Sequence, residues 1–272
     1  MGLEDANKNL EIFQNLIDLE KCGDFKGNLK VGVDLGTANI VISVVDEDNK
    51  PIAGASSPAT VVKDGLVVDF MGAVEIVRNL KSKVETILGQ KITCASCAIP
   101  PGIDPADAKT IANVLSSCDI DVVNILDEPT AASLVLGILD GAVVDVGGGT
   151  TGVSILKDGK VLYTADEPTG GIHMSLVIAG NYKIPVEDAE ILKKDIKKEK
   201  ENFMLVRPVV EKMAHIVKTH LNGYAVEKIY VVGGACSFKD FEEVFESVTG
   251  VETVKPKRPL LVTPLGIAMG SI

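Results

Sequence analysis

The sequence predicts an α/β protein made of two similar lobes. Segments with strand patterns and segments with helix patterns alternate along most of the chain, which is typical of the α/β class. A pattern of strand, aspartate, glycine-rich turn and second strand occurs twice, around Asp34 and around Asp145, which are 111 positions apart. A repeat at the length of a domain, in a chain of 272 residues, indicates an internal duplication and therefore two lobes related by a pseudo-twofold axis.

The first elements lead into the first repeat and away from it. Residues 6–21 place apolar side chains on one face of a helix, and Gly23 ends that pattern. Alternating residues predict a hairpin with strands at 31–35 and 40–45. Two short strands around an Asp64-Gly65 turn come next, followed by a helix whose apolar face comprises Val74, Val77, Leu80, Val84 and Leu88.

The middle of the chain continues the alternation. An apolar run at 92–99 predicts a strand that stops at Pro100, and Asp104 can cap the helix that begins at Pro105. A strand at 122–126 and a helix from Pro129 to about Gly137 follow.

The second repeat and the elements after it complete the chain. The second hairpin takes up residues 144–154, and a turn at Asp158-Gly159 leads to a further strand. The predicted elements that follow are strands at 161–165 and 228–232 and helices at 171–178, 186–200, 209–221, 238–245 and 264–272. We expect residues 1–29 to form an amphipathic helix and linker, 30–139 together with 260–272 to form the first lobe, and 140–259 the second.

The composition excludes several classes of function. Lys and Arg number 27 against 38 Asp and Glu, and the net charge of −11 repels nucleic acid and anionic membranes. No apolar run approaches the length of a membrane span, and acidic residues near the N-terminus do not fit a secretory signal, so we expect a cytoplasmic protein. Five scattered cysteines indicate reduced thiols, and the Cys94 and Cys97 pair on an apolar strand is typical of a core rather than of a metal or redox site.

The two glycine-rich hairpins predict a phosphate-binding site. The chain has neither the GxxxxGK[ST] pattern of a P-loop nor a GxGxxG turn between a strand and a helix. Facing glycine-rich turns can offer backbone N–H groups to phosphates, and carboxylates at the strand ends, Asp34 and Asp145, can hold Mg²⁺ through its water ligands. One such turn alone is more often an ordinary tight turn, but two matched copies favour the phosphate site. Further polar groups for the phosphates come from Thr37, Asn39, Thr150 and Thr151.

Five motifs make a resemblance specific. Over residues 30–272 the chain resembles the actin and heat-shock-70 ATPase superfamily, and the motifs occur in that superfamily's order. They are the first phosphate loop at 34–39, the connecting helix at 128–132, the second phosphate loop at 145–151, the adenosine loop at 232–235 and the closing helix at 263–268. The resemblance implies two pseudo-duplicated ribonuclease-H-like lobes with a reduced insertion in the second. Within the superfamily, the chain resembles the EutJ family of ethanolamine utilization in four segments, at 69–74, 100–105, 165–173 and 176–181.

The resemblance implies a role for each matched residue. Four residues would be catalytic: Asp34 and Asp145 would hold the waters of Mg²⁺, Glu128 would position the attacking water or the metal shell, and Thr150 would bond the γ-phosphate. Turnover would be an in-line attack by water on ATP. The remaining contacts to ATP would come from Gly36, Thr37, Ala38, Asn39, Gly147, Gly148, Gly149, Thr151, Glu190, Lys193, Gly233 and Gly234.

The chain also departs from the superfamily pattern. Heat-shock-70 proteins carry a catalytic lysine in the first lobe, for which Lys63 and Arg78 are candidates here by basicity alone. The part of the second lobe that covers adenine is reduced to little more than a helix around Glu190 and Lys193. We expect any client to bind outside a peptide-binding domain of the heat-shock-70 kind. The N-terminal helix has two interpretations. It either binds a partner, as the targeting helices of microcompartment cargo do, or packs on its own lobe.

Three functions are open at this level. The first is an ATPase with ATP and Mg²⁺ as cofactors, acting as a chaperone or reactivating factor for ethanolamine-pathway enzymes or shell proteins, in the cytoplasm and in association with a microcompartment. The second is a nucleotide-responsive or nucleotide-free scaffold without hydrolysis, which the missing lysine and short second lobe favour. The third, a small-molecule kinase, would need a general-base Asp and a sugar pocket for which the chain has no dedicated motif.

Overall fold

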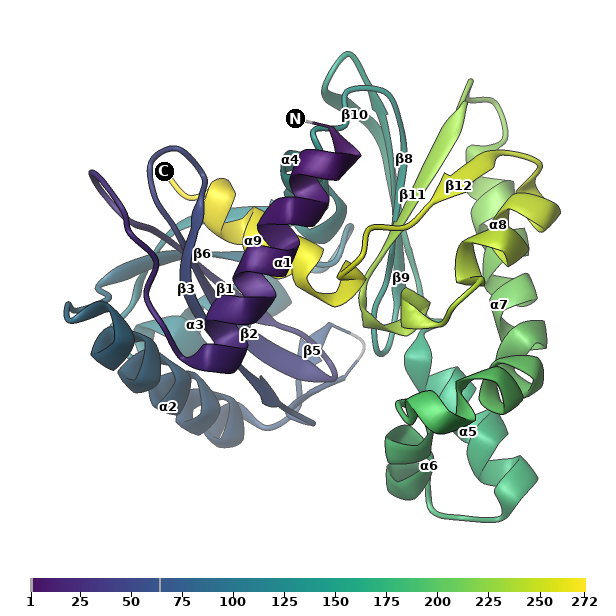
Figure 1. Ribbon diagram of the computed structural model, residues 1–272, viewed down its shortest axis with the longest axis horizontal. Coiled ribbons are helices and arrows are strands. Elements are labelled where there is room, and N and C mark those ends of the chain that lie inside the picture. The colour runs from purple at the N-terminus through teal and green to yellow at the C-terminus, as the bar shows by residue number, and fades with distance from the viewer. Residues whose placement is uncertain (1, 64) are drawn as a thin grey trace.

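Two five-stranded sheets, one in each lobe, form the framework of the molecule (Figure 1). The computed structural model describes residues 2–63 and 65–272. The strand orders are β3-β2-β1-β6-β7 and β10-β9-β8-β11-β12. In each sheet three successive strands form an antiparallel meander, and two later strands extend it in parallel beside the first strand of the meander. The predicted α/β class and the duplication of the lobes are therefore confirmed.

The strand bounds place both aspartates near the ends of equivalent strands. Asp34 lies opposite Val41 in the first hairpin, and Asp145 lies opposite Gly152 in the second. The strands of the first sheet are β1 (Lys30–Leu35), β2 (Asn39–Val45), β3 (Pro51–Pro58), β6 (Cys94–Ile99) and β7 (Asp121–Asp127). Those of the second are β8 (Gly141–Val146), β9 (Thr151–Lys157), β10 (Lys160–Glu167), β11 (Lys228–Val232) and β12 (Glu252–Val254). The limits of the two lobes along the chain stay a prediction.

Helices α2 (Phe70–Leu88) and α3 (Pro105–Ser116) pack on the first sheet and share one apolar core with it. Each begins at an aspartate cap: Asp69 accepts a hydrogen bond from Gly72 N at 2.9 Å, and Asp104 accepts one from Ala106 N at 2.8 Å. The predicted short strand pair is present as β4 (Val62–Lys63) and β5 (Leu66–Val67), while Asp64 of its turn lies outside the described residues.

The second sheet has a separate core of its own. Helices α5, α7 and α8 contribute most of the helical residues of that core, and the short α6 projects at the far end of the lobe, as Figure 1 shows. The helical segments of this lobe are α5 (Gly171–Tyr182), α6 (Val186–Lys193), η1 (Ile196–Lys198), α7 (Glu199–Leu221), η2 (Gly234–Ser237) and α8 (Phe241–Thr249).

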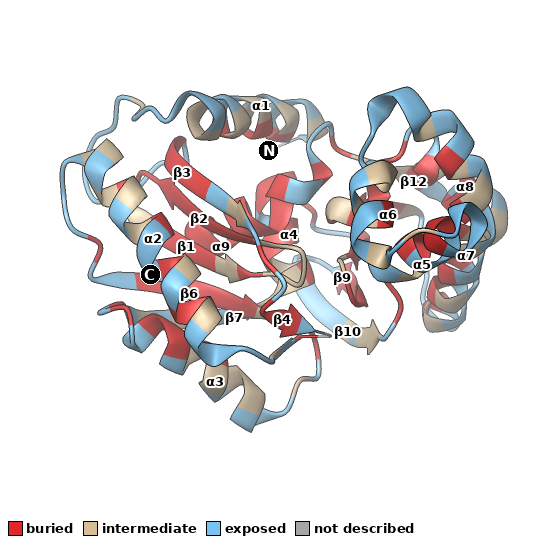
Figure 2. Ribbon diagram, turned by 90° about the horizontal axis from the view of Figure 1, so that it is seen from below, coloured by how far each residue is buried: buried red, intermediate tan, exposed pale blue. Residues whose placement is uncertain are grey.

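Two short helices, α4 (Glu128–Leu136) and α9 (Val262–Met269), join the lobes. η3 (Pro259–Leu261) leads into α9. A third apolar core combines α4 and α9 with residues of both sheets, and both helices are coloured as mostly buried in Figure 2. The helices approach so closely that a Cβ atom on Gly266 would lie 1.9 Å from the Ala131 carbonyl oxygen. The contact between the lobes therefore depends on a glycine at this crossing.

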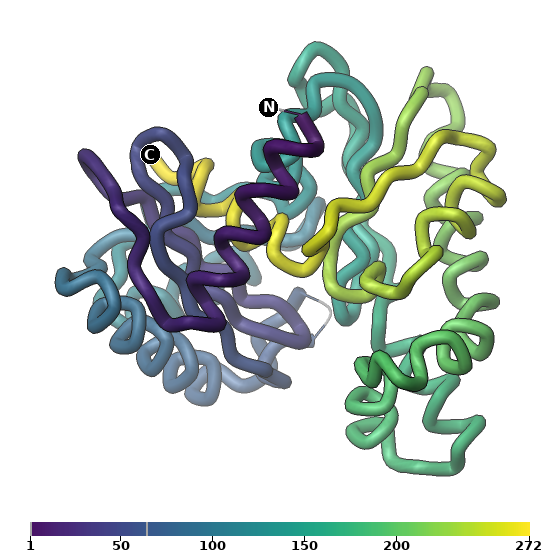
Figure 3. Tube along the Cα trace, viewed as in Figure 1, coloured from purple at the N-terminus to yellow at the C-terminus, as the bar shows by residue number. Residues whose placement is uncertain are grey.

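The N-terminal helix α1 (Leu3–Leu19) packs on its own protein. Ala6, Leu10 and Phe13 are fully buried, and Gly54 of β3 leaves room for the Phe13 ring. In Figure 3, α1 runs beside the segment that leads to α9, where Lys257 bonds Glu11 through Nζ at 2.9 Å. Of the two interpretations of this helix, the structure therefore supports the helix packed on its own lobe, because its apolar face is already covered.

Several predicted elements need correction. Strands β3 and β12 were not predicted, because β3 is rich in small residues and has proline at both ends, where the missing N–H groups disturb no central ladder. The predicted helices at 186–200 and 209–221 are wrong in their bounds: α6 ends at Lys193, and α7 runs through Pro208 without a break. Pro208 is exposed while Val206 and Val210 are buried, so packing holds both halves of α7 in one helix.

The prediction that both CxxC thiols lie in the core is also wrong for one of them. Cys97 is buried, whereas Cys94 is exposed at the start of β6. The apolar run begins as a strand only at Cys94, and the first residue of that strand is not covered.

Candidate functional site

A cavity of about 920 Å³ lies between the two lobes and gathers nearly every predicted site residue. Both glycine-rich turns, the connecting helix, the turn after β11 and α6 contribute to its wall. The predicted residues that line it are Asp34, Gly36, Thr37, Ala38, Asn39, Glu128, Asp145, Gly147, Gly148, Gly149, Thr150, Glu190, Lys193, Gly233 and Gly234. A volume of this size is ordinary for a small-molecule or cofactor site.

The two glycine-rich turns line the cavity and meet each other at Gly148. A Cβ atom on Gly148 would lie 3.2 Å from Thr37 Cβ and 3.4 Å from Ala38 Cβ. The absence of a side chain at Gly148 therefore lets the two turns approach each other this closely. This arrangement is the one that the duplicated motif predicts.

The second turn is held in place by the start of α5. Gly171 N donates to Gly147 O at 2.9 Å, and Ile172 N donates to Gly148 O at 2.8 Å. Gly170 fits against the same turn, since a Cβ atom there would lie 2.6 Å from the Gly149 carbonyl carbon. The carbonyl groups of the turn are thus occupied by the helix.

Three carboxyl groups, of Asp34, Glu128 and Asp145, line the cavity. Burial, with the nearby Asp145 charge, raises the pKa of Asp34 to about 7. Burial also raises the pKa of Asp145 to about 6, although a hydrogen bond from Thr263 opposes the shift. The pKa of Glu128 is raised well above its usual value by burial and by the charges of Asp145 and Asp34. Each group would therefore ionise more readily if a cation entered.

The chemistry of these oxygens fits a hard divalent cation such as Mg²⁺. Across residues 2–63 and 65–272, no three carboxylate, imidazole or thiol groups are close enough together to ligate one ion directly. Mg²⁺ usually keeps several of its water molecules when one or two carboxylates and phosphates bind it.

Two contacts of Asp145, with Thr263 and with Gly233, were not predicted from the sequence. Thr263 Oγ1, near the start of α9, donates to Asp145 Oδ2 at 2.5 Å. The closing-helix motif contained this threonine, but only the fold brings it across to the second sheet. Gly233 has φ +90°, and a Cβ atom there would lie 2.3 Å from Asp145 Oδ1, so glycine is required beside the carboxylate.

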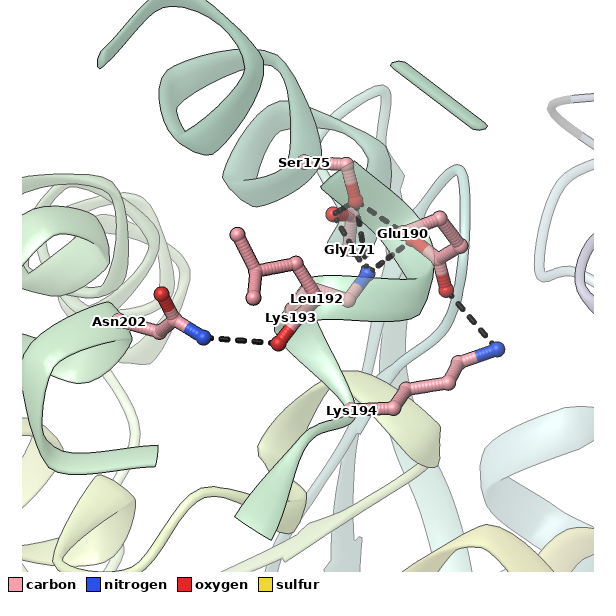
Figure 4. A network of polar contacts seen from close by, with 7 residues as sticks. All are labelled: Gly171, Ser175, Glu190, Leu192, Lys193, Lys194 and Asn202. Carbon is pink, nitrogen blue, oxygen red and sulfur yellow. Dashed lines mark hydrogen bonds and ion pairs between the residues drawn. The ribbon is translucent and has the colours of Figure 1, made fainter. Parts of the chain in front are cut away.

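Glu190 and Lys193 form a polar network at the second-lobe side of the cavity (Figure 4). Lys193 Nζ lies 2.6 Å from Glu190 Oε2, and it donates to Gly171 O and to Ser175 Oγ, each at 3.0 Å. Lys194 Nζ pairs with the other Glu190 oxygen at 3.0 Å. Burial lowers the pKa of Lys193, and the pKa of Glu190 is lowered because its lysine and serine partners outweigh burial. Glu190 is therefore held ionised, with its orientation fixed.

Other predicted residues lie elsewhere. Thr151 does not line the cavity, because its hydroxyl is buried and donates to Thr169 O at 2.6 Å. Lys63 is not part of the cavity wall either, and Arg78 donates to Ser117 O at 2.8 Å on the outer side of the first lobe. In the part of the chain that the structure describes, the cationic side chains of the wall, Lys193 and Lys194, both come from the second lobe.

Comparisons with known proteins agree with this architecture. The family model described as type IV pilus assembly protein PilM matches residues 136–258. The chain is 44% identical over 241 residues to the ethanolamine utilization protein EutJ of Salmonella typhimurium, covering 88% of this chain and 85% of that protein. Among the described residues, no helix is both long enough and apolar enough to cross a bilayer.

Solved structures extend the comparison. The crystal structure of EutJ from Carboxydothermus hydrogenoformans is 48% identical and matches 98% of each chain with a TM-score of 0.93. MreB 5 of Spiroplasma citri bound to AMPPNP matches with a TM-score of 0.71 at 18% identity, over 89% of this chain and 95% of that one. At that identity the likeness to MreB shows the fold alone.

Proposed function

The chain belongs to the EutJ family of ethanolamine utilization proteins and has the actin and heat-shock-70 fold. We propose that it binds Mg·ATP in the cavity between its lobes. We propose further that it is an ATPase whose turnover drives a chaperone or reactivating activity on an ethanolamine-pathway enzyme or shell protein. Its place would be the cytoplasm, in association with a microcompartment.

The observation that carries this proposal is that two glycine-rich turns and two aspartates line the same cavity. Gly148 of one turn lies against Thr37 and Ala38 of the other, and Asp34 and Asp145 line the same cavity. Backbone N–H groups and hydroxyl groups near a divalent cation are the groups that a polyphosphate requires. The MreB structure with AMPPNP adds an example of a nucleotide bound to this fold.

Each residue would have a separate task in the site. Mg²⁺, when bound, would neutralise the phosphate charge. The carboxylates of Asp34 and Asp145 would accept hydrogen bonds from its water ligands, and Thr150 would donate to the terminal phosphate. Glu128, with its raised pKa, is suited to accept a proton from an attacking water near neutral pH. Glu190 and Lys193 would hold the adenosine end, since their network fixes both side chains at the cavity wall.

A scaffold that binds nucleotide without hydrolysis is the second candidate. Within the described residues, neither lysine nor arginine reaches the cavity from the first lobe. A superfamily site that lacks such a cation near the terminal phosphate would stabilise the transition state less. Binding with no turnover would favour this second function.

Calorimetric titration of Mg·ATP into the purified protein tests the binding proposal. We expect saturable binding that falls at least about tenfold in Asp34→Asn and in Asp145→Asn, because each removes a charged partner of the cation shell. Asp48→Asn, at an exposed turn outside the cavity, is the control and should bind as the wild type does. Phosphate release by the wild type separates the ATPase from the scaffold, and absence of binding at millimolar Mg·ATP would overturn both nucleotide functions.

The proposed partner has its own test. Co-purification from cells grown on ethanolamine, with and without Mg·ATP, should recover an ethanolamine-pathway enzyme or a shell protein in a nucleotide-dependent amount. The same recovery by the Asp145→Asn variant would show that the contact does not depend on the cavity, and it would contradict a nucleotide-driven chaperone.

A further inference from the structure

Two adjacent residues at the start of α9 connect the two sheets by hydrogen bonds. Thr263 Oγ1 donates to Asp145 Oδ2 of β8 at 2.5 Å. Pro264, the next residue, accepts through its carbonyl oxygen from Ser43 Oγ of β2, also at 2.5 Å. All three hydroxyl and carboxyl side chains are at most 6% exposed, so these bonds are shielded from water.

α9 is fixed firmly to the first sheet. A Cβ atom on Gly32 of β1 would lie 2.4 Å from Ala268 N, which shows how closely the strand and the helix approach. Lys30 Nζ donates to Met269 O at the C-terminal end of α9, at 3.1 Å. With the Ser43 bond at its start, the helix is held to the first sheet at both ends and must move with it.

The Asp145 side of the bond belongs to the second sheet. One carboxylate oxygen accepts from Thr263, while the other lies against Gly233, where a Cβ atom would approach it to 2.3 Å. Gly233 N in turn donates to Pro259 O of η3 at 3.0 Å. The segment 259–263 thus contacts both the carboxylate and the turn beside it.

The hydroxyl of Thr263 does not cap its own helix. α9 begins without a side-chain cap, although serine and threonine near a helix start commonly bond the helix backbone. The hydroxyl donates instead to the carboxylate of Asp145, which belongs to the other lobe and lines the cavity.

We propose that Thr263 is a positioning residue for the cation of the nucleotide site: it fixes the orientation of the Asp145 carboxylate and makes that orientation depend on how the first lobe sits against the second. The proposal rests on the proposed function, because Asp145 is taken as a partner of the Mg²⁺ water shell. A shift of the first sheet carries α9 with it, and the Thr263 bond transmits the shift to Asp145. Binding at the cation shell in turn biases the relation of the lobes.

The test compares three variants by calorimetric titration with Mg·ATP and with ATP in EDTA. Thr263→Val, which keeps the shape and removes the hydroxyl, should weaken Mg·ATP binding about tenfold, the effect of one hydrogen bond to a charged group. It should leave the Mg-free affinity nearly unchanged. Thr263→Ser should bind Mg·ATP as the wild type does. Thr253→Val makes the same change at a buried threonine of β12, outside the cavity, and should leave both affinities unchanged.

Wild-type affinity for Mg·ATP in Thr263→Val would overturn the proposal, and so would an equal loss with and without Mg²⁺, which would indicate a merely structural role. A double-mutant cycle of Thr263→Val and Asp145→Asn on the unfolding equilibrium of the nucleotide-free protein tests the contact independently. We expect the two changes to be non-additive by about tenfold in the equilibrium constant. If the wild type binds no nucleotide, the proposed function fails, and additivity in this cycle would then overturn the positioning of Asp145 as well.

Discussion

A single methyl group at Gly266 is expected to disturb the junction of the two lobes. Gly266 lies where α9 crosses α4, and a Cβ atom there would be 1.9 Å from Ala131 O and 2.4 Å from Ala131 C. The obstacle is backbone of a buried helix rather than a flexible side chain, so the two helices must separate to admit the methyl group.

The expected magnitude follows from two opposing effects. Overpacking of a well-packed core costs about 1–3 kcal/mol and occasionally more, and a clash with backbone belongs at the upper end of that range. Alanine in place of a helical glycine stabilises the helix by up to about 1 kcal/mol. We therefore expect Gly266→Ala to lower the free energy of unfolding by about 2 kcal/mol, which corresponds to about 4–8 °C in Tm for a chain of this length.

Urea denaturation and thermal melting of the variant measure this loss. Gly180→Ala in α5 is the matched control, because a Cβ atom on Gly180 meets nothing within 4 Å. This control should be neutral or stabilise by up to about 1 kcal/mol. If Gly266→Ala were as stable as the wild type while Gly180→Ala behaved as expected, the close crossing of α4 and α9 would be refuted.

The structure supports three further predictions. Burial raises the pKa of Asp34 to about 7, so the folded state binds more protons than the unfolded state from about pH 4 to pH 7, and the free energy of unfolding should fall as pH rises through that window. Asp34→Asn should flatten this slope in urea titrations, and a slope equal to that of the wild type would contradict the shift. Gly233→Ala places a methyl group 2.3 Å from Asp145 Oδ1 at φ +90°, so titration should show Mg·ATP binding at least about tenfold weaker, and unchanged binding would refute the tight fit. Iodoacetamide should label only the exposed thiols, Cys22 and Cys94, in the native protein, and modification of a third thiol detected by mass spectrometry would contradict their burial.

The sequence predicted the duplication because the repeated unit carries its own chemistry. The two aspartates, their glycine turns and their flanking strands recur at one spacing, and the structure places them at equivalent positions of two sheets. The family resemblance was confirmed by relatives that cover nearly the whole chain. Local sequence patterns were therefore sufficient to predict the two hairpins, because the residues of each hairpin determine its strands and turn.

Long-range contacts account for what the sequence could not predict. β3 has few β-branched residues and exists because β2 and α1 cover it, and α7 passes through Pro208 because buried residues on both sides hold it to the core. The bond between Thr263 and Asp145 joins residues 118 positions apart, so no local pattern could reveal it.

A crystal structure with Mg²⁺ and a nonhydrolysable ATP analogue would show directly whether the cavity between the lobes is a nucleotide site. We expect the triphosphate between the turns at 36–39 and 147–150, with Mg²⁺ joined through water to Asp34 and Asp145. A structure obtained at a saturating concentration of the analogue, with the nucleotide bound elsewhere or with the cavity still empty, would contradict it.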